Sequence, residues 1–143
     1  MSPIKEKERI KEFYEDVRNN STGTNWALLT YDGDNIIPLE TGEDFEDFKS
    51  HFTSEERFYG YLRIETGDEM SKRSKFVFIT WVGTQVSMMK QAKVSTDKNF
   101  VRDILTNYAV EVFAQELSEV SYDTIADLVK KAGGANYGTG RRD

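Results

Sequence analysis

The sequence predicts an α/β domain in which a central mixed sheet of about five strands is flanked by helices. Helical and strand-like patterns follow one another in the order α-β-β-α-β-β-α-β-α, which a layered sandwich accounts for. Residues 75–82 form a nearly continuous apolar run, the pattern of a central strand that is covered on both faces. The chain of 143 residues has the length of one domain, and with 0 cysteines it folds without disulfides.

Two helices are expected in the first third of the chain. A helix over about residues 2–18 has Ser2 as its expected cap. Its apolar stripe is formed by Ile10, Phe13, Tyr14 and Val17. A shorter helix is expected over residues 43–51, with three phenylalanines on one side.

The strands of the first half alternate between two faces. Strands at 26–31 and 36–37 enclose an Asp32-Gly33 turn, and Pro38 indicates that the second of them lies at a sheet edge. A strand over 57–66 places tyrosines on one face. Its other face carries Phe58, Gly60, Leu62 and Ile64.

A long helical stretch is expected from 84 to 108, after the central strand. The residues 94–97 (VSTD) favour caps and strands over helix interiors, so a kink or local break is predicted there. One face of its first half is expected to hold Val86, Met89 and Lys93.

The C-terminal part predicts one more strand and one more helix. The strand covers 110–114, and the helix begins at a Ser121 cap and ends at Gly133. Residues 1–132 are therefore expected to form the domain, and residues 133–143 a flexible Gly-rich tail.

Charge is distributed unevenly along this acidic chain. The net charge is −6, which argues against general nucleic-acid binding and anionic membranes. Residues 32–69 carry a net charge of −9, whereas residues 70–98 carry +5. The basic block is either a solvated face or the contact surface for an acidic partner.

Composition excludes several kinds of chemistry. The single histidine, His51, rules out multi-histidine metal sites, and the chain has no phosphate-binding loop. Neither Asp32–Asn35 nor the Gly-rich end at 138–142 has the context of a calcium or phosphate site. No catalytic residue, metal, cofactor or membrane insertion is expected. A hydrolase using His51 and nearby acids, and an RNA-binding module, remain as alternatives.

Longer strings of residues resemble one protein family. Residues 66–83 (TGDEMSKRSKFVFITWVG) and 128–137 (LVKKAGGANY) are similar to the central and C-terminal segments of coactosins, members of the actin-depolymerising-factor homology (ADF/cofilin) superfamily. The stretches around Trp26 to Gly33 and around 93–98 agree with this. The resemblance extends over about residues 5–137.

The resemblance implies an ADF-homology fold, with five or six strands and four or five helices, and filamentous actin as the partner. In this superfamily the long helix after the central strand lies against actin, and the connector before that strand makes a second, filament-specific contact. The matching actin-binding residues are Lys72, Arg73 and Lys75 on the connector, and Lys90, Lys93 and Lys98 on the helix.

One departure from the superfamily pattern affects the expected activity. Cofilins carry a Lys-x-Lys-Met run early in the long helix, whereas this chain reads Met89-Lys90-Gln91-Ala92. The resemblance therefore implies a monomeric cytosolic protein that binds filament sides without depolymerising them and can oppose barbed-end capping. Binding to monomeric actin is expected to be weak or absent. A cofilin-like protein that binds monomers and severs filaments is the alternative.

Overall fold

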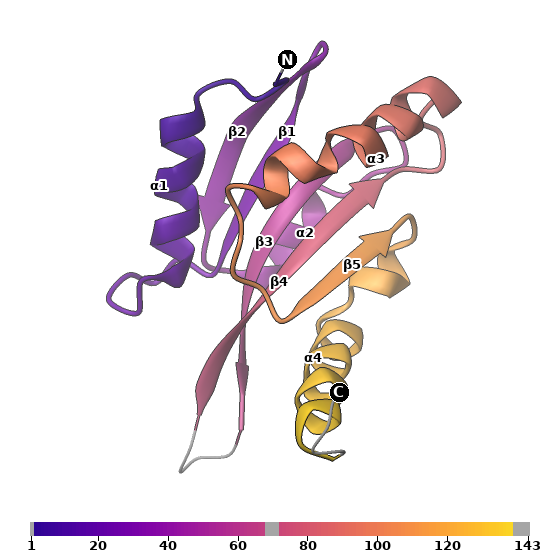
Figure 1. Cartoon of the computed structure of the whole chain (residues 1–143). Helices are drawn as coiled ribbons and strands as arrows, with labels where there is room; N and C mark the ends of the chain where they lie inside the picture. Colours follow the sequence, from indigo (N-terminus) through magenta and orange to yellow (C-terminus); the bar gives the residue numbers. More distant parts are fainter. Residues whose placement is uncertain (1, 68–71, 139–143) are drawn as a thin grey trace.

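The computed structural model describes residues 2–67 and 72–138, with side chains as far as residue 133. Five strands form one sheet in the order β2-β1-β3-β4-β5 (Figure 1). Neighbouring strands are antiparallel except β4 and β5, which are parallel, so the sheet is mixed. The strands are β1 (Trp26–Asp32), β2 (Asn35–Gly42), β3 (Arg57–Thr66), β4 (Arg73–Val82) and β5 (Val110–Ala114).

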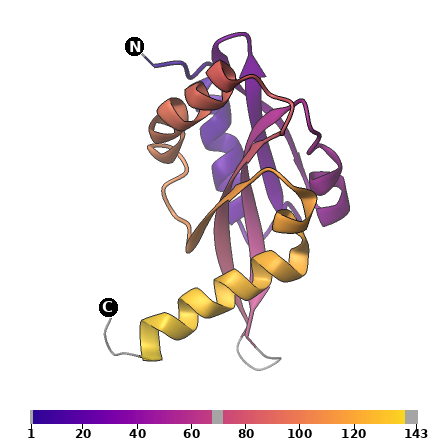
Figure 2. The same ribbon diagram turned by 90° about the vertical axis from the view of Figure 1, so that its right-hand side faces the viewer.

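Helices cover both faces of this sheet. They are α1 (Lys7–Arg18), α2 (Phe45–Ser50), α3 (Met88–Arg102), the 3-10 helix η1 (Leu117–Val120) and α4 (Tyr122–Gly138). Helices α1 and α3 pack on one face, and α2, η1 and the first half of α4 pack on the other (Figure 2). The predicted element order and α/β class are confirmed.

Strand β3 explains why two separate cores form. Its alternate side chains are buried on opposite faces, as the sequence predicts. Tyr59 and Tyr61 pack beneath α1 and α3, while Phe58, Leu62 and Ile64 pack beneath α2 and α4. The edge position predicted from Pro38 is also confirmed, because β2 is the outermost of the five strands on its side of the sheet.

The long β3–β4 hairpin extends past its neighbours at one end of the sheet (Figure 1). Strand β1 pairs with β3 only from Phe58 to Leu62, and β5 pairs with β4 only from Val77 to Trp81. The outer parts of the two strands, up to the pair of Thr66 with Arg73, therefore pair with each other alone. Residues 68–71, which include the first half of the expected connector at 69–74, lie outside the described residues.

The first helix is shorter than expected. It begins at Lys7, and the Ser2 hydroxyl accepts a bond from the Ile4 N–H (3.1 Å) without capping the helix. Ile4 instead forms a parallel bridge with Ile36 on β2. The helix follows Glu6, which has a left-handed backbone (φ 55°) and provides no side-chain cap. The prediction of a Ser2 cap is wrong because the chain pairs with a sheet edge first.

The local break predicted at 94–97 is also wrong. Helix α3 is continuous from Met88 to Arg102 and is capped by Ser87, whose hydroxyl accepts from the Lys90 N–H (3.3 Å). Its buried residues are Val94, Asp97 and Val101. Tertiary contacts of this face outweigh the weak helix preference of the segment.

The last helix begins as predicted and ends later. The Ser121 hydroxyl accepts from the Thr124 N–H (3.2 Å), which confirms the cap. Ile125 and Val129 anchor the helix in the core. Helix α4 continues through Gly138, so the predicted end at Gly133 is wrong. The domain boundary at residue 132 and the tail over 133–143 stay predictions; residues 139–143 lie outside the described part.

Candidate functional site

The fold places the six candidate basic residues in two groups, one on the outer β3–β4 hairpin and one on α3. Lys72, Arg73 and Lys75 lie at the outer end of the β3–β4 hairpin. The other three lie on α3, which crosses the sheet from the far end of β4 towards its middle (Figures 1 and 2). Lys90 lies in the first turn of α3, whereas Lys98 contacts Glu111, which pairs with Phe78 in the middle of β4. Strand β4 connects the two ends; its 10 residues span about 30 Å. The six residues therefore do not form one continuous patch.

The hairpin group combines exposed and half-buried side chains. Lys72 and Arg73 are exposed, whereas Lys75 is half-buried. Lys75 lies opposite Ile64 within the hairpin, and it is the third residue of β4, so it does not mark the start of the strand as the sequence suggested. Alternation along β4 places Lys75 on the face of Val77 and Ile79, which pack against α4. Lys75 thus lies on the face of the sheet opposite to α3.

Arg63 fixes the base of the hairpin to α1. Its Nε and Nη2 both donate to the carbonyl oxygen of Val17 (3.1 and 2.7 Å), near the C-terminal end of α1. Its Nη1 also donates to the Ser74 hydroxyl (2.9 Å), and that hydroxyl donates to Glu65 (2.8 Å). The hairpin is thereby held on one side by a helix, although no further strand pairs with its outer half.

The first turn of α3 presents an apolar and basic surface to solvent. Met88 and Met89 are each 85% exposed, and Lys90 is exposed beside them. Met89 was expected to share one face with Val86, but Val86 is buried while Met89 is exposed, so that grouping is wrong. Helical periodicity could have predicted that Met89 is exposed. At about 100° per residue, Met88 and Met89 lie far around the helix from the buried stripe that begins at Val94. These two methionines are the candidate site residues that the sequence reasoning missed.

Lys93 and Lys98 have partners within the chain, unlike Lys90. The Lys93 ammonium lies 3.0 Å from the Asp97 carboxylate, and the Lys98 ammonium lies 2.9 Å from Glu111 on β5. Among the described residues Lys90 has no ion-pair partner. The predicted basic face of α3 therefore contains one freely exposed ammonium and two that also hold the helix in place.

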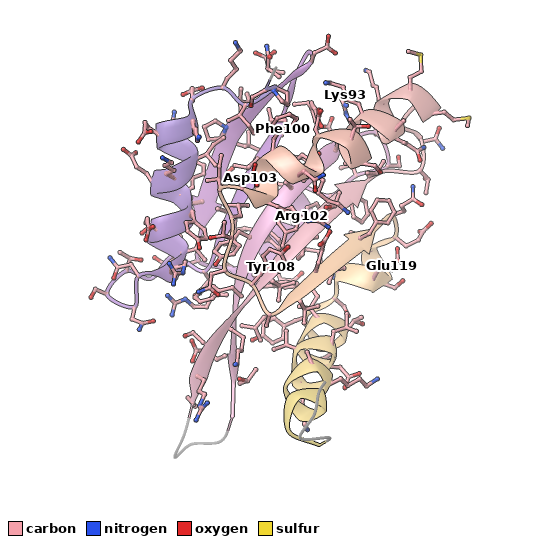
Figure 3. The ribbon with its side chains drawn as sticks, in the orientation of Figure 1. Lys93, Phe100, Arg102, Asp103, Tyr108 and Glu119 are labelled. Atoms are coloured by element: carbon pink, nitrogen blue, oxygen red, sulfur yellow. The ribbon has the colours of Figure 1, made fainter. Side chains whose placement is uncertain are left out.

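Glu111 joins the end of α3 to β5 through two cations. Arg102, labelled in Figure 3, donates to Glu111 at 2.6 Å, alongside the Lys98 contact. Partial burial favours a higher pKa for Glu111, but the hydrogen bonds from Lys98 and Arg102 outweigh it and lower the pKa. Both cations consequently stabilise the position of α3 against the edge strand.

An open depression of about 800 Å³ lies beside the first turn of α3. It is bordered by the β1–β2 turn, by residues 55–57 and by α3. Its charged lining mixes both signs and consists of Asp34, Glu55, Glu56, Arg57, Lys90 and Lys93. A surface of this kind suits contact with another protein better than the burial of a small ligand.

The His51 ring is held by structural contacts. Its Nδ1 lies 2.8 Å from the Asp47 carbonyl oxygen and its Nε2 lies 3.1 Å from the Glu40 carboxylate. Within residues 2–67 and 72–138, no group of three or more acidic or histidine side chains is arranged to hold a metal ion. None of the helices in the described part combines the length and apolarity of a membrane span.

The sequence matches known proteins over most of its length. Residues 3–130 match the family described as "Cofilin/tropomyosin-type actin-binding protein". The coactosin-like protein of Bos taurus is 42% identical over 132 residues, which cover 92% of this chain and 93% of the relative. Coactosin of Dictyostelium discoideum is 37% identical, with 90% of each chain covered.

Solved structures show the same similarity. Human coactosin-like protein superposes with a TM-score of 0.87 at 37% identity, covering 92% of this chain and 99% of the human one. Mouse coactosin, described as an actin filament binding protein, gives a TM-score of 0.79 at 38% identity and 99% coverage of both chains. Streptomyces griseoflavus cofilin is 20% identical and shares the fold, with a TM-score of 0.79, over 90% of this chain and 96% of its own.

The chain belongs to the ADF/cofilin family of actin-binding proteins. Within that family it is of the coactosin type, as its relatives at about 40% identity establish. Proteins of this type bind actin and are not enzymes, which confirms the expectation of a non-catalytic protein. The roles of the individual basic residues stay predictions.

Proposed function

We propose that this protein binds the sides of actin filaments without depolymerising them and opposes barbed-end capping. The observation that carries the proposal is the separation of two exposed cationic surfaces by the length of β4, about 30 Å. The first surface, the hairpin surface, consists of Lys72, Arg73 and Lys75. The second, the α3 surface, consists of Met88, Met89 and Lys90.

Two surfaces on one rigid body favour a partner that repeats. Once one surface is bound, the other is held close to its own target, so two weak contacts together give a usable affinity. Neighbouring subunits of a filament offer both targets, whereas a single actin monomer offers fewer. The description of mouse coactosin as an actin filament binding protein supports the same partner.

The composition of the α3 surface is also an argument that binding to monomeric actin is weak. Cofilins have a pair of lysines early in this helix, and this chain has Lys90 alone between Met89 and Gln91. Lys93, one turn later, is paired with Asp97 and does not replace the missing charge fully. We infer a monomeric protein in the cytoplasmic actin cytoskeleton.

Cosedimentation tests this proposal directly. Increasing amounts of the protein are mixed with actin filaments and centrifuged at high speed. The protein should enter the pellet while the amount of pelleted actin stays constant. Raising the salt from about 50 to about 200 mM should weaken binding several-fold, because the Debye length falls below 10 Å. A dose-dependent rise of actin in the supernatant would instead support the cofilin-like alternative.

A second assay addresses capping. Pyrene-actin elongation from filament seeds is followed with a barbed-end capping protein present. Adding this chain should restore part of the elongation rate. The matched comparison is Lys75→Ala, which we expect to keep the fold and to restore less. An elongation rate that this chain leaves unchanged would contradict the capping part of the proposal while leaving side binding intact.

A further inference from the structure

Two tyrosines and one carboxylate connect α3 to the sheet. Asp97 is only 5% exposed, and the Tyr31 hydroxyl donates to its Oδ2 at 2.9 Å. The Tyr59 hydroxyl, 3.0 Å from that of Tyr31, donates to the carbonyl oxygen of Val94 at 2.7 Å. Tyr31 belongs to β1 and Tyr59 to β3, so hydroxyls from two neighbouring strands hold consecutive turns of one helix.

Each hydroxyl has one hydrogen, and both hydrogens are directed to α3. Burial, the largest cause, raises the pKa of Tyr31 and of Tyr59 well above the usual value for tyrosine, so both remain neutral donors. Arg57 lies over the Tyr31 ring, 3.9 Å from its centroid, and fixes the ring from outside. A hydrophobic contact tolerates small rotations of a helix, whereas these directed bonds do not.

The rotation of α3 determines where its first turn points. Lys90 precedes Asp97 by two helical turns on the same continuous helix, so an orientation fixed at Asp97 is transmitted to the α3 surface. A surface presented in one orientation loses less entropy on binding than one that moves.

We propose that Tyr31, Tyr59 and Asp97 are positioning residues that hold the α3 surface in its actin-binding orientation. This inference rests on the proposed function. It assigns to three groups a binding role that acts through the orientation of α3, and it separates that role from simple stabilisation of the fold.

Tyr61 provides a matched control on the same face of the sheet. Its hydroxyl is also buried and donates to the Asn107 carbonyl oxygen, which lies beyond the end of α3. Tyr31→Phe, Tyr59→Phe and Tyr61→Phe each keep the ring and remove one hydrogen-bonded hydroxyl. All three should lower the melting temperature by a similar few degrees.

Filament binding and amide hydrogen exchange then distinguish the roles. Well below the melting temperatures, Tyr31→Phe and Tyr59→Phe should raise the dissociation constant roughly 3- to 5-fold, and Tyr61→Phe less than about 2-fold. Amides of α3 should exchange faster in the first two variants only. If Tyr31→Phe and Tyr59→Phe match Tyr61→Phe in both measurements, the positioning role is wrong. A different outcome is that α3 amides exchange faster in these two variants but the wild-type protein does not pellet with filaments. In that case the proposed function and the link to actin are wrong, whereas the role of the two tyrosines in fixing α3 stands.

Discussion

Lys90 and Lys93 look equivalent in the sequence and differ in the structure. They lie three residues apart on α3 and carry the same charge. Lys93 is paired with Asp97 at 3.0 Å, with the lysine side chain 31% exposed and the aspartate side chain 7% exposed. Lys90 is exposed in the first turn. Lys93→Ala should therefore mainly lower the stability of the fold, whereas Lys90→Ala should mainly weaken filament binding.

The expected loss of unfolding free energy follows from the Asp97 carboxylate that Lys93→Ala leaves without its ammonium partner. Breaking a fully buried ion pair costs about 3–5 kcal/mol, because the remaining charge is uncompensated. Lys93 is partly exposed and Tyr31 still donates to Asp97, so about 2 kcal/mol of unfolding free energy should be lost. For a domain of this size that loss lowers the melting temperature by roughly 8 °C. Lys90→Ala should change it by less than about 2 °C.

Thermal unfolding and cosedimentation test both variants side by side. Binding is measured well below either melting temperature, so that the folded fraction does not limit it. Lys90→Ala should weaken filament binding about 5-fold, equivalent to about 1 kcal/mol. The reasoning is refuted if Lys93→Ala melts like the wild type, or if Lys90→Ala is the less stable of the two.

Three further predictions follow from other contacts. Lys75→Ala should weaken filament binding at least about 5-fold with little change in melting temperature, and Lys49→Ala on α2 should do little; equal binding by both variants would contradict the assigned hairpin surface. The folded protein lowers the pKa of Glu111, so the ionised carboxylate stabilises the fold at neutral pH and this stabilisation is lost as the pH falls below about 4. Between pH 7 and pH 3, the melting temperature of Glu111→Gln should therefore fall less than that of the wild type. Truncation after Gly133 should leave folding and most of the affinity intact, since the buried anchors of α4 precede it, and a loss of several degrees would show that the tail is docked.

Local sequence patterns were sufficient to predict most of the strands of the sheet. The bounds predicted for β3 and β5 agree with the structure, because alternation and turn residues are local signals that the sheet preserves. The apolar run at 75–82 correctly predicts a strand covered on both faces, and Pro38 an edge. The start of β4 was missed because its first residues, from Arg73, are polar and pair only within the hairpin.

The sequence predictions were wrong where contacts between residues far apart in the sequence determine the structure. The segment 94–97 is a weak helix former by itself, but α3 continues through it because Val94 and Asp97 are bound by tyrosines from β1 and β3. The pairing of Lys98 with Glu111 has no local signal, since it joins two elements. The Lys93–Asp97 contact has i,i+4 spacing and was within reach of the sequence.

The basic block that is continuous in the sequence is divided by the fold, and the proposed function depends on this division. Strand β4 runs between the two ends, so residues before it and after it are separated by its length. Each end is fixed by its own contacts: Arg63 ties the hairpin to α1, and the tyrosine bonds tie α3 to the sheet. Because both surfaces belong to one packed body, their spacing is set by the sheet rather than by a flexible linker. Under the proposed function, we expect this fixed spacing to favour a partner whose acidic sites recur, such as a filament, over an isolated acidic protein.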